Sequence, residues 1–178
     1  TTEIVTYQAG SADISTGPDM QVARADAAAV SVGESGVVVA GGRTNDAAML
    51  SPAKTGEFGR LDSGGWSSAW DLTTPRRDPA LVSLEYSDDL VLIGGTDADG
   101  EAIPNAERLE FQGKSSDPVY KSGGTTGTIQ PTRRRMSVAP AGNGMALLSG
   151  GIGEVGGQVA ALEGLQYFNP VDTPPSSN

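Results

Sequence analysis

The sequence predicts an all-β fold built from a repeated unit of roughly 50 residues. The main evidence is an arginine that is followed, seventeen residues later, by a glycine pair that ends a short apolar run. This segment occurs three times, at intervals of 53 and 56 residues, and a nearly fixed period indicates a repeat architecture. The 25 glycines and the aromatic content of 5% are typical of short strands joined by tight turns. The three segments run from Arg24 to Gly41-Gly42, from Arg77 to Gly94-Gly95 and from Arg133 to Gly150-Gly151.

Length, charge and composition exclude several classes of protein. A chain of 178 residues can bury one substantial core, and its longest apolar runs have the length of strands rather than of membrane helices. The net charge of −10 opposes binding to nucleic acid, because phosphate contacts need clustered cations. Without histidine or cysteine the chain forms no disulfide and no Ser-His-Asp or Cys-His nucleophilic site.

Each repeat begins with two strands and a tight turn between them. The first strand consists of small and apolar residues, and the turn is rich in Gly, Asn, Asp and Ser. The second strand is almost entirely apolar, which predicts burial on both faces, and it ends where a Cβ atom would obstruct close approach of the backbone. The first strands are Ala27–Val32, Ala80–Tyr86 and Met136–Ala139; the second are Val37–Ala40, Leu90–Ile93 and Ala146–Leu148.

A third and a fourth strand follow a loop of variable length. The pattern Glu-x-apolar-x-aromatic at Glu107–Phe111 and Glu163–Tyr167 predicts third strands whose apolar residues share one face. In the first repeat we expect the third strand at Ala47–Leu50. The expected fourth strands are Trp66–Leu72 in the first repeat, and Val119–Gly123 or Thr128–Gln130 in the second.

These features resemble the Kelch repeat family. In that family a blade starts near an arginine, ends its second strand with a glycine pair, and carries an aromatic residue in the third strand and a tryptophan in the fourth. The first repeat matches with Trp70, the second with Phe111 and the third with Tyr167, although tryptophan is missing after the first repeat. The resemblance implies a Kelch-like β-propeller section of about three four-stranded antiparallel blades in an incomplete ring.

The repeat phase divides the chain into five parts. Residues 1–20 match the last two strands of a preceding blade, because Glu3–Tyr7 has the third-strand pattern. Residues 21–74 form blade one, 75–131 blade two, 132–170 three strands of blade three, and 171–178 a linker or disordered tail.

An incomplete ring leaves apolar blade faces open, because closed propellers have about 4–8 blades. The missing blades would come from a longer parent chain, from homodimerisation in which the N-terminal strands complete the partner's last blade, or from another subunit. We favour the first, because the chain starts at Thr1 within a blade rather than at methionine. Composition also leads us to expect a secreted or extracytoplasmic protein of bacterial origin.

Three groups of residues are candidates for a site. The first group is the repeat arginines Arg24, Arg77 and Arg133, which would hold an anionic ligand in a channel. Alternatively, they bond blade carbonyls and acids such as Glu107 and Glu163. Their recurrence in every repeat favours this structural role. Asp97, Asp99 and Glu101 resemble the start of a calcium loop, but these residues are also common in ordinary turns.

The two tryptophans form the third group. Trp66 and Trp70 are four residues apart, so we expect them on the same side of one strand. Trp70 matches the packing tryptophan of the Kelch family and is expected in the core. Trp66 follows Gly64-Gly65 and is the better candidate for a ligand platform that stacks on a sugar.

The expected function is a non-catalytic binding or scaffold module that contacts a protein or glycan partner through its loops. Thr96–Asn105 and Lys114–Gln130 are the variable loops expected to carry protein–protein interaction or carbohydrate binding. We expect no nucleic-acid partner, no membrane insertion and no cofactor other than calcium. The copper oxidases of the Kelch fold need histidine and cysteine ligands, which this segment lacks. The alternative is part of a carbohydrate-active enzyme, a lyase or epimerase, that uses channel-facing arginine, glutamate and tyrosine.

Overall fold

The computed structural model describes residues 2–33, 36–46, 49–53, 55–60, 65–67, 70–85, 87–113 and 119–170. All regular elements in these ranges are β-strands, and they pair in antiparallel sheets, which confirms the predicted all-β class. The same residues contain no helix of the length and apolarity needed to cross a membrane. The predicted tail at 171–178 lies outside the described residues.

The first sheet is a meander with one short added strand. It contains β4 (Ala28–Val32), β5 (Gly36–Ala40), β8 (Thr55–Arg60) and β10 (Trp70–Asp71) in the order β10-β8-β5-β4, and β9 (Gly65–Trp66) also pairs with β8. The expectation that Ala47–Leu50 is the third strand was wrong. The backbone of β5 is instead paired with Thr55–Arg60, whereas β7 (Met49–Pro52) belongs to a separate hairpin.

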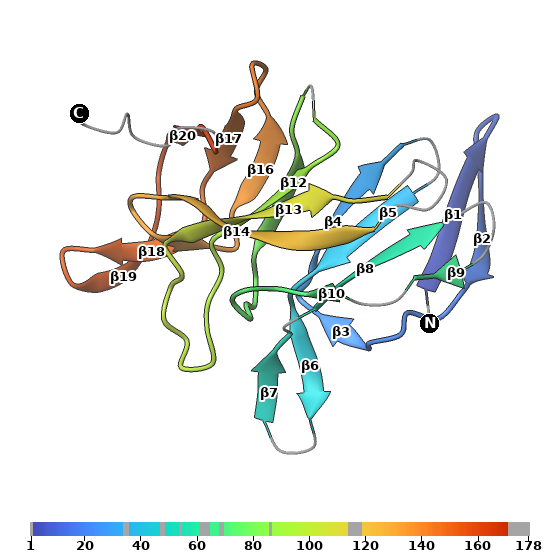
Figure 1. Ribbon diagram of the computed structural model, residues 1–178, viewed down its shortest axis with the longest axis horizontal. Helices are drawn as coiled ribbons and strands as arrows, with labels where there is room; N and C mark the ends of the chain where they lie inside the picture. The colour runs from blue at the N-terminus through green and yellow to red at the C-terminus, as the bar shows by residue number, and fades with distance from the viewer. Residues whose placement is uncertain are drawn as a thin grey trace.

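The second and third sheets repeat this meander (Figure 1). The second is β11 (Ala80–Ser83), β12 (Leu90–Ile93), β13 (Asn105–Phe111) and β14 (Tyr120–Thr128). The third has three strands, β16 (Ser137–Pro140), β17 (Ala146–Ser149) and β20 (Leu165–Phe168). The strand β14 includes most of one expected fourth strand and only the first residue of the other. No strand pairing joins one of these sheets to the next, and the described residues do not form a closed ring.

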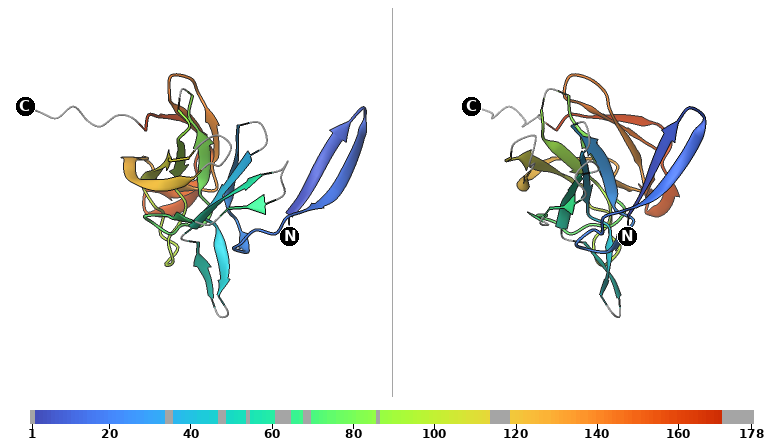
Figure 2. Two further views of the ribbon diagram at one scale, coloured as in Figure 1. Left: turned by 45° about the vertical axis from the view of Figure 1, so that its right-hand side comes forward. Right: turned by 90° about the vertical axis from the view of Figure 1, so that its right-hand side faces the viewer.

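Additional hairpins extend from this row of sheets. After their glycine pairs the first and third repeats form the hairpins β6 (Arg43–Asp46) with β7, and β18 (Ile152–Val155) with β19 (Gln158–Ala161). These pair with β3 (Arg24–Ala25) and β15 (Arg133–Arg134), respectively. The N-terminal hairpin, β1 (Thr2–Gln8) with β2 (Ser11–Gly17), projects from the end of the row beside the first sheet (Figure 2).

The second sheet forms the centre of the core because both of its faces are covered. Leu90, Leu92 and Leu109 pack against the first sheet, whereas Val91 and Ile93 pack against the third. All four residues of β12 are at most 1% exposed, which confirms the burial predicted from its continuous apolarity. Adjacent sheets also meet at their inner strands, since β11 contacts both β4 and β16.

The two glycines of each pair have different neighbours. A Cβ atom on the second glycine would meet the backbone that leads into the same sheet, at Ala25 O for Gly42 and Arg134 O for Gly151. A Cβ atom on the first glycine would meet the backbone that leads into the next sheet, at Arg76 O for Gly41 and Arg133 O for Gly94. Gly150 has the same positive φ but nothing within 4 Å, because no sheet follows it among the described residues.

We expect Gly94→Ala to destabilise the protein more than Gly150→Ala. Both substitutions force a side chain into left-handed backbone, at φ +62° and +61°, which costs about 1–2 kcal/mol. Only the Cβ atom at position 94 would collide with Arg133 O and with Met136, which adds about 1–3 kcal/mol. Urea denaturation of both variants measures the difference, and equal losses would contradict this account of the first glycine.

We also expect the stability of the protein to fall at alkaline pH through Tyr120. This ring packs against Trp70 and Phe111 at centroid distances of 5.6 and 5.7 Å. Its burial, together with Asp88 and Asp89, raises the pKa of Tyr120 to about 12. Because the folded-state pKa is raised, the contribution to stability is complete below pH 10 and is lost as the pH rises through about 12. Absorbance titration should show a late tyrosine ionisation that Tyr120→Phe removes; its persistence in that variant would contradict the assignment.

Candidate functional site

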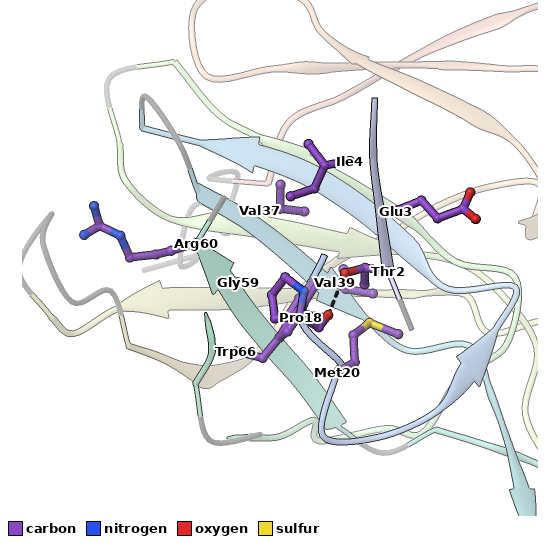
Figure 3. Close-up of a pocket in the computed structure, with 10 residues that line it drawn as sticks. All are labelled: Thr2, Glu3, Ile4, Pro18, Met20, Val37, Val39, Gly59, Arg60 and Trp66. Atoms are coloured by element: carbon purple, nitrogen blue, oxygen red, sulfur yellow. Dashed lines mark hydrogen bonds between the residues drawn. The ribbon is translucent and has the colours of Figure 1, made fainter. Parts of the chain in front are cut away.

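The candidate site is a pocket of about 250 Å³ between the N-terminal hairpin and the first sheet (Figure 3). The hairpin and the segment after it form one wall, and strands β5, β8 and β9 form the other. Most of the lining is apolar. The lining residues are Thr2, Glu3, Ile4, Pro18, Met20, Val37, Val39, Gly59, Arg60 and Trp66.

Trp66 joins the two walls of the pocket. Its strand pairs with β8 so that Trp66 lies opposite Gly59, and a Cβ atom there would be 2.9 Å from the indole ring. The indole Nε1–H donates a hydrogen bond to Pro18 O over 3.2 Å, and the Thr2 hydroxyl donates to the same carbonyl over 2.6 Å. The glycine therefore admits the half-buried indole, while Pro18 fixes its edge to the N-terminal hairpin.

The two tryptophans lie on opposite faces of the first sheet, so the expectation that they share one side was wrong. Trp66 lies on β9 opposite Gly59, and Trp70 lies on β10 opposite Gly56. Gly59 and Gly56 are three positions apart on β8, and an odd separation on a strand reverses the face. Trp70 packs against the cluster between the first and second sheets, which confirms its expected place in the core.

The pocket offers mainly dispersion contacts to a ligand. The Thr2 hydroxyl and the Trp66 N–H already donate to Pro18 O, so neither of these protons is directed at a ligand. Figure 3 shows the side chains of Glu3 and Arg60 pointing away from the pocket on opposite sides. An apolar group therefore suits the interior, and charged groups flank the opening.

The three repeat arginines bond to the backbone of their own sheets. Arg24 donates to Gly41 O and Thr55 O over 2.9 and 2.8 Å. Arg76 makes the equivalent bonds to Gly94 O and Asn105 O, over 3.0 and 2.9 Å. Arg133 donates to Gly150 O over 3.1 Å. The second arginine of this set is therefore Arg76, and the predicted equivalence of Arg77 was wrong by one residue.

An extra residue between β11 and the glycine pair explains this shift. The first strand pairs with the second so that Ala28 faces Ala40 and Ala80 faces Ile93, each immediately before a glycine pair. The chain between these partners is one residue longer in the second repeat. Counting seventeen residues back from the glycine pair therefore reaches Arg77 instead of Arg76. Arg77 instead donates to Asp97 O over 2.9 Å.

Buried glutamates hold the segments that lead into the first two sheets. We call residues 21–24, 73–76 and 130–133 the entry segments. Glu57 accepts backbone N–H bonds from Gln21 and Val22 over 2.7 and 3.1 Å, and Glu107 accepts them from Thr73 and Thr74 over 2.7 and 3.4 Å.

Each of these glutamates also pairs with the arginine of its entry segment. The Arg24–Glu57 and Arg76–Glu107 ion pairs have N–O distances of 2.5 and 3.5 Å. All four side chains are at most 2% exposed. Burial lowers the pKa of Arg76, and the charge of Glu107 opposes that shift.

The third sheet lacks this carboxylate. Gln166 pairs with Leu148, two residues before a glycine pair, as Glu57 pairs with Val39 and Glu107 with Leu92. Glu163, the expected partner, is exposed and precedes β20, so the predicted third-strand register in this repeat was wrong. In the part of the chain that is described, Arg133 has no ion pair, and burial alone lowers its pKa.

The acidic loop at 97–101 is organised as a turn. The Asp97 carboxylate accepts N–H bonds from Asp99 and Glu101 over 3.0 and 2.9 Å. The described residues contain no group of three side chains placed to hold a metal ion. Calcium binding by Asp97, Asp99 and Glu101 stays a prediction.

No family model matches the sequence, and no curated protein matches it.

Sequence reasoning found Trp66 but missed its pocket, Glu57 and Arg76. The pocket depends on how the N-terminal hairpin sits against the first sheet; the pattern at Glu3–Tyr7 predicted a preceding blade but not which residues line the space between the two. Glu57 does not show the pattern found at Glu107, because Gly59, which makes room for Trp66, stands at the apolar position and Leu61 stands at the aromatic position. The doublet Arg76-Arg77 was the signal that the second arginine admits two alignments.

We expect Glu107→Gln to lower the free energy of unfolding by about 3 kcal/mol, because it leaves the buried Arg76 without its counter-charge. The matched control is Glu110→Gln, which removes an exposed ion pair with Lys121 and should cost below about 1 kcal/mol. Chemical denaturation compares the two. Similar midpoints would show that the carboxylate at position 107 is not needed to hold the entry segment.

Proposed function

We propose that the chain is a non-catalytic binding or scaffold module built as a section of a Kelch-like β-propeller. Three antiparallel sheets with corresponding strand registers lie in a row, and an arginine of each entry segment bonds the first glycine of a pair, which supports the propeller interpretation. In this arrangement the repeated residues maintain the scaffold, and the non-repeated residues contact the partner.

The Trp66 pocket is the observation that carries this proposal. It combines an indole with the side chains of Ile4, Met20, Val37 and Val39 in a concave site. An aliphatic or aromatic side chain of a protein would fill such a pocket, and so would the apolar face of a sugar ring stacked on the indole. The partner class is accordingly a protein or a glycan.

The arginines favour binding over catalysis. The alternative lyase or epimerase would need an arginine free to meet an acidic sugar. The Arg24 and Arg76 side chains are 1% exposed and already bond carbonyls and carboxylates. A ligand would reach them only if the entry segments separated from their sheets. The proposal therefore assigns recognition to Trp66 and the loops.

We expect Trp66→Ala to weaken binding of a ligand found by screening immobilised glycans and peptides by about tenfold or more, as loss of a central aromatic anchor does. The control is Val159→Ala on β19, outside the pocket. Calorimetry measures both affinities, and circular dichroism verifies that the variants are folded. An unchanged affinity in Trp66→Ala would contradict the pocket, and Arg77-dependent turnover of an acidic sugar would defeat the non-catalytic assignment.

A further inference from the structure

Of the eight large apolar side chains that are exposed among the described residues, five lie on two surfaces at opposite ends of the row of sheets; the other three are Val119, Val155 and Val159. Val5, Tyr7 and Ile14 lie on the N-terminal hairpin and are 63%, 73% and 64% exposed. Leu165 and Tyr167 lie on β20 of the third sheet and are 66% and 67% exposed. Contiguous apolar side chains in water indicate an interaction surface.

The free face of the third sheet corresponds to a face that the first sheet buries. Tyr167 pairs with Leu147, three residues before a glycine pair, just as Phe58 pairs with Val38. Phe58 is 5% exposed because it packs against the second sheet. Tyr167 occupies the same register position with no sheet in front of it among the described residues.

The environment of Gly150 supports this correspondence. In the first two sheets the first glycine of the pair lies against the entry segment of the following sheet. Among the described residues, nothing lies within 4 Å of a Cβ atom at Gly150. The third sheet therefore presents the side that the fold uses for packing sheet on sheet, and no described residue covers that side.

The N-terminal hairpin presents the complementary side. Val5 pairs with Ile14 and Tyr7 with Ala12, so these four residues share one face. Thr2 and Ile4 belong to the opposite face and line the pocket against the first sheet. The exposed face thus points away from the row of sheets.

The sequence of β1 indicates what this exposed face would pack against. Glu3, Val5 and Tyr7 match Glu107, Leu109 and Phe111 in the third-strand pattern. Leu109 is buried against the first sheet, and Phe111 is packed against the same cluster. The exposed face of the hairpin is therefore of the kind that packs against the sheet before it. Among the described residues, no such face packs against the third sheet.

We propose that a second copy of this chain supplies that contact, with the hairpin face Val5, Tyr7, Ala12 and Ile14 of each copy packed on the third-sheet face Leu147, Leu165 and Tyr167 of the other. The two contacts are identical and are related by a two-fold axis, so the pair closes and does not propagate into a filament. This chain carries both complementary faces, each continuing an existing sheet-to-sheet interface, so a second copy replaces the longer parent chain that the sequence alone favoured as the occupant. This inference goes beyond the proposed binding function and does not use the interior of the Trp66 pocket.

Charge predicts how the association responds to salt. Each copy carries a net charge of −10, and like charges repel over about one Debye length. Besides their apolar residues, the two faces carry the charged Glu3 and the uncharged polar residues Thr16, Ser137 and Ser149. Added salt should therefore strengthen the dimer by screening the repulsion.

Analytical ultracentrifugation of the intact chain from about 1 to about 100 µM, the range that resolves micromolar affinities, tests the proposal. We expect a dimer whose dissociation constant falls as salt is added. Tyr167→Asp should raise that constant at least tenfold, whereas Val159→Asp, at a position that is 70% exposed on β19, should leave it unchanged. A monomer throughout this range would overturn the proposal, as would equal effects of the two substitutions.

Mixing two variants tests which faces meet. Tyr7→Asp and Tyr167→Asp should each be largely monomeric, and thermal melts verify that both are folded. Their mixture should recover heterodimers, because the intact hairpin of the Tyr167→Asp chain meets the intact third sheet of the Tyr7→Asp chain. Failure of the mixture to associate more than either variant alone would overturn the pairing of these two faces.

Discussion

The buried bonds between the entry segments and the sheets fix where each sheet lies relative to the next. In each of the first two sheets a buried glutamate accepts two backbone N–H groups and forms an ion pair with one guanidinium, and the same guanidinium bonds the carbonyl of a glycine. Hydrogen bonds to charged groups are worth about 1.5–3 kcal/mol each, and loss of one partner leaves an uncompensated buried charge. The glycine pair then lets the next entry segment approach closely, since Gly42 N–H and Gly95 N–H donate to Arg76 O and Arg133 O. Local conformation and the spacing between sheets are thus set by one group of contacts.

The third sheet keeps its arginine but has lost the carboxylate that pairs with it elsewhere. Gln166 stands where the first two sheets have glutamate, and Pro131 occupies the entry-segment position where Val22 and Thr74 donate N–H groups. A proline has no N–H to donate, so one of the bonds that favour a carboxylate is missing together with the carboxylate. Arg133 keeps its bond to Gly150 O without a counter-ion among the described residues. The contact with the glycine carbonyl is therefore common to all three sheets, whereas the ion pair belongs to two.

The sequence was sufficient to predict the all-β class, the close approach of backbone at the glycine pairs and the buried core strands, because each depends on local chemistry. Continuous apolarity predicted the burial of Leu90–Ile93, and the glycine pairs predicted close approach of the backbone. Inserted hairpins defeated the prediction of the third strand in the first repeat, since β6 and β7 separate the glycine pair from β8. The tryptophans were expected on one side of a single strand because their spacing is even, but they lie on two strands that pair with β8 at different positions. The arginine assignment failed because a hairpin lengthened by one residue shifts the spacing in the chain without changing the spatial pattern.

One wall of the Trp66 pocket belongs to a separate two-stranded sheet, because Thr2, Ile4, Pro18 and Met20 come from the N-terminal hairpin and its connection. A ligand that fills the pocket contacts both walls, so it also stabilises the docked position of the hairpin. Thermodynamic linkage makes this effect reciprocal: anything that holds the hairpin in place raises the affinity of the pocket by the same factor by which the ligand favours docking. The Pro18 carbonyl accepts hydrogen bonds from both Trp66 and Thr2, so it links the first sheet directly to the hairpin. Affinity at the pocket therefore depends on how firmly the hairpin is docked as well as on the lining residues.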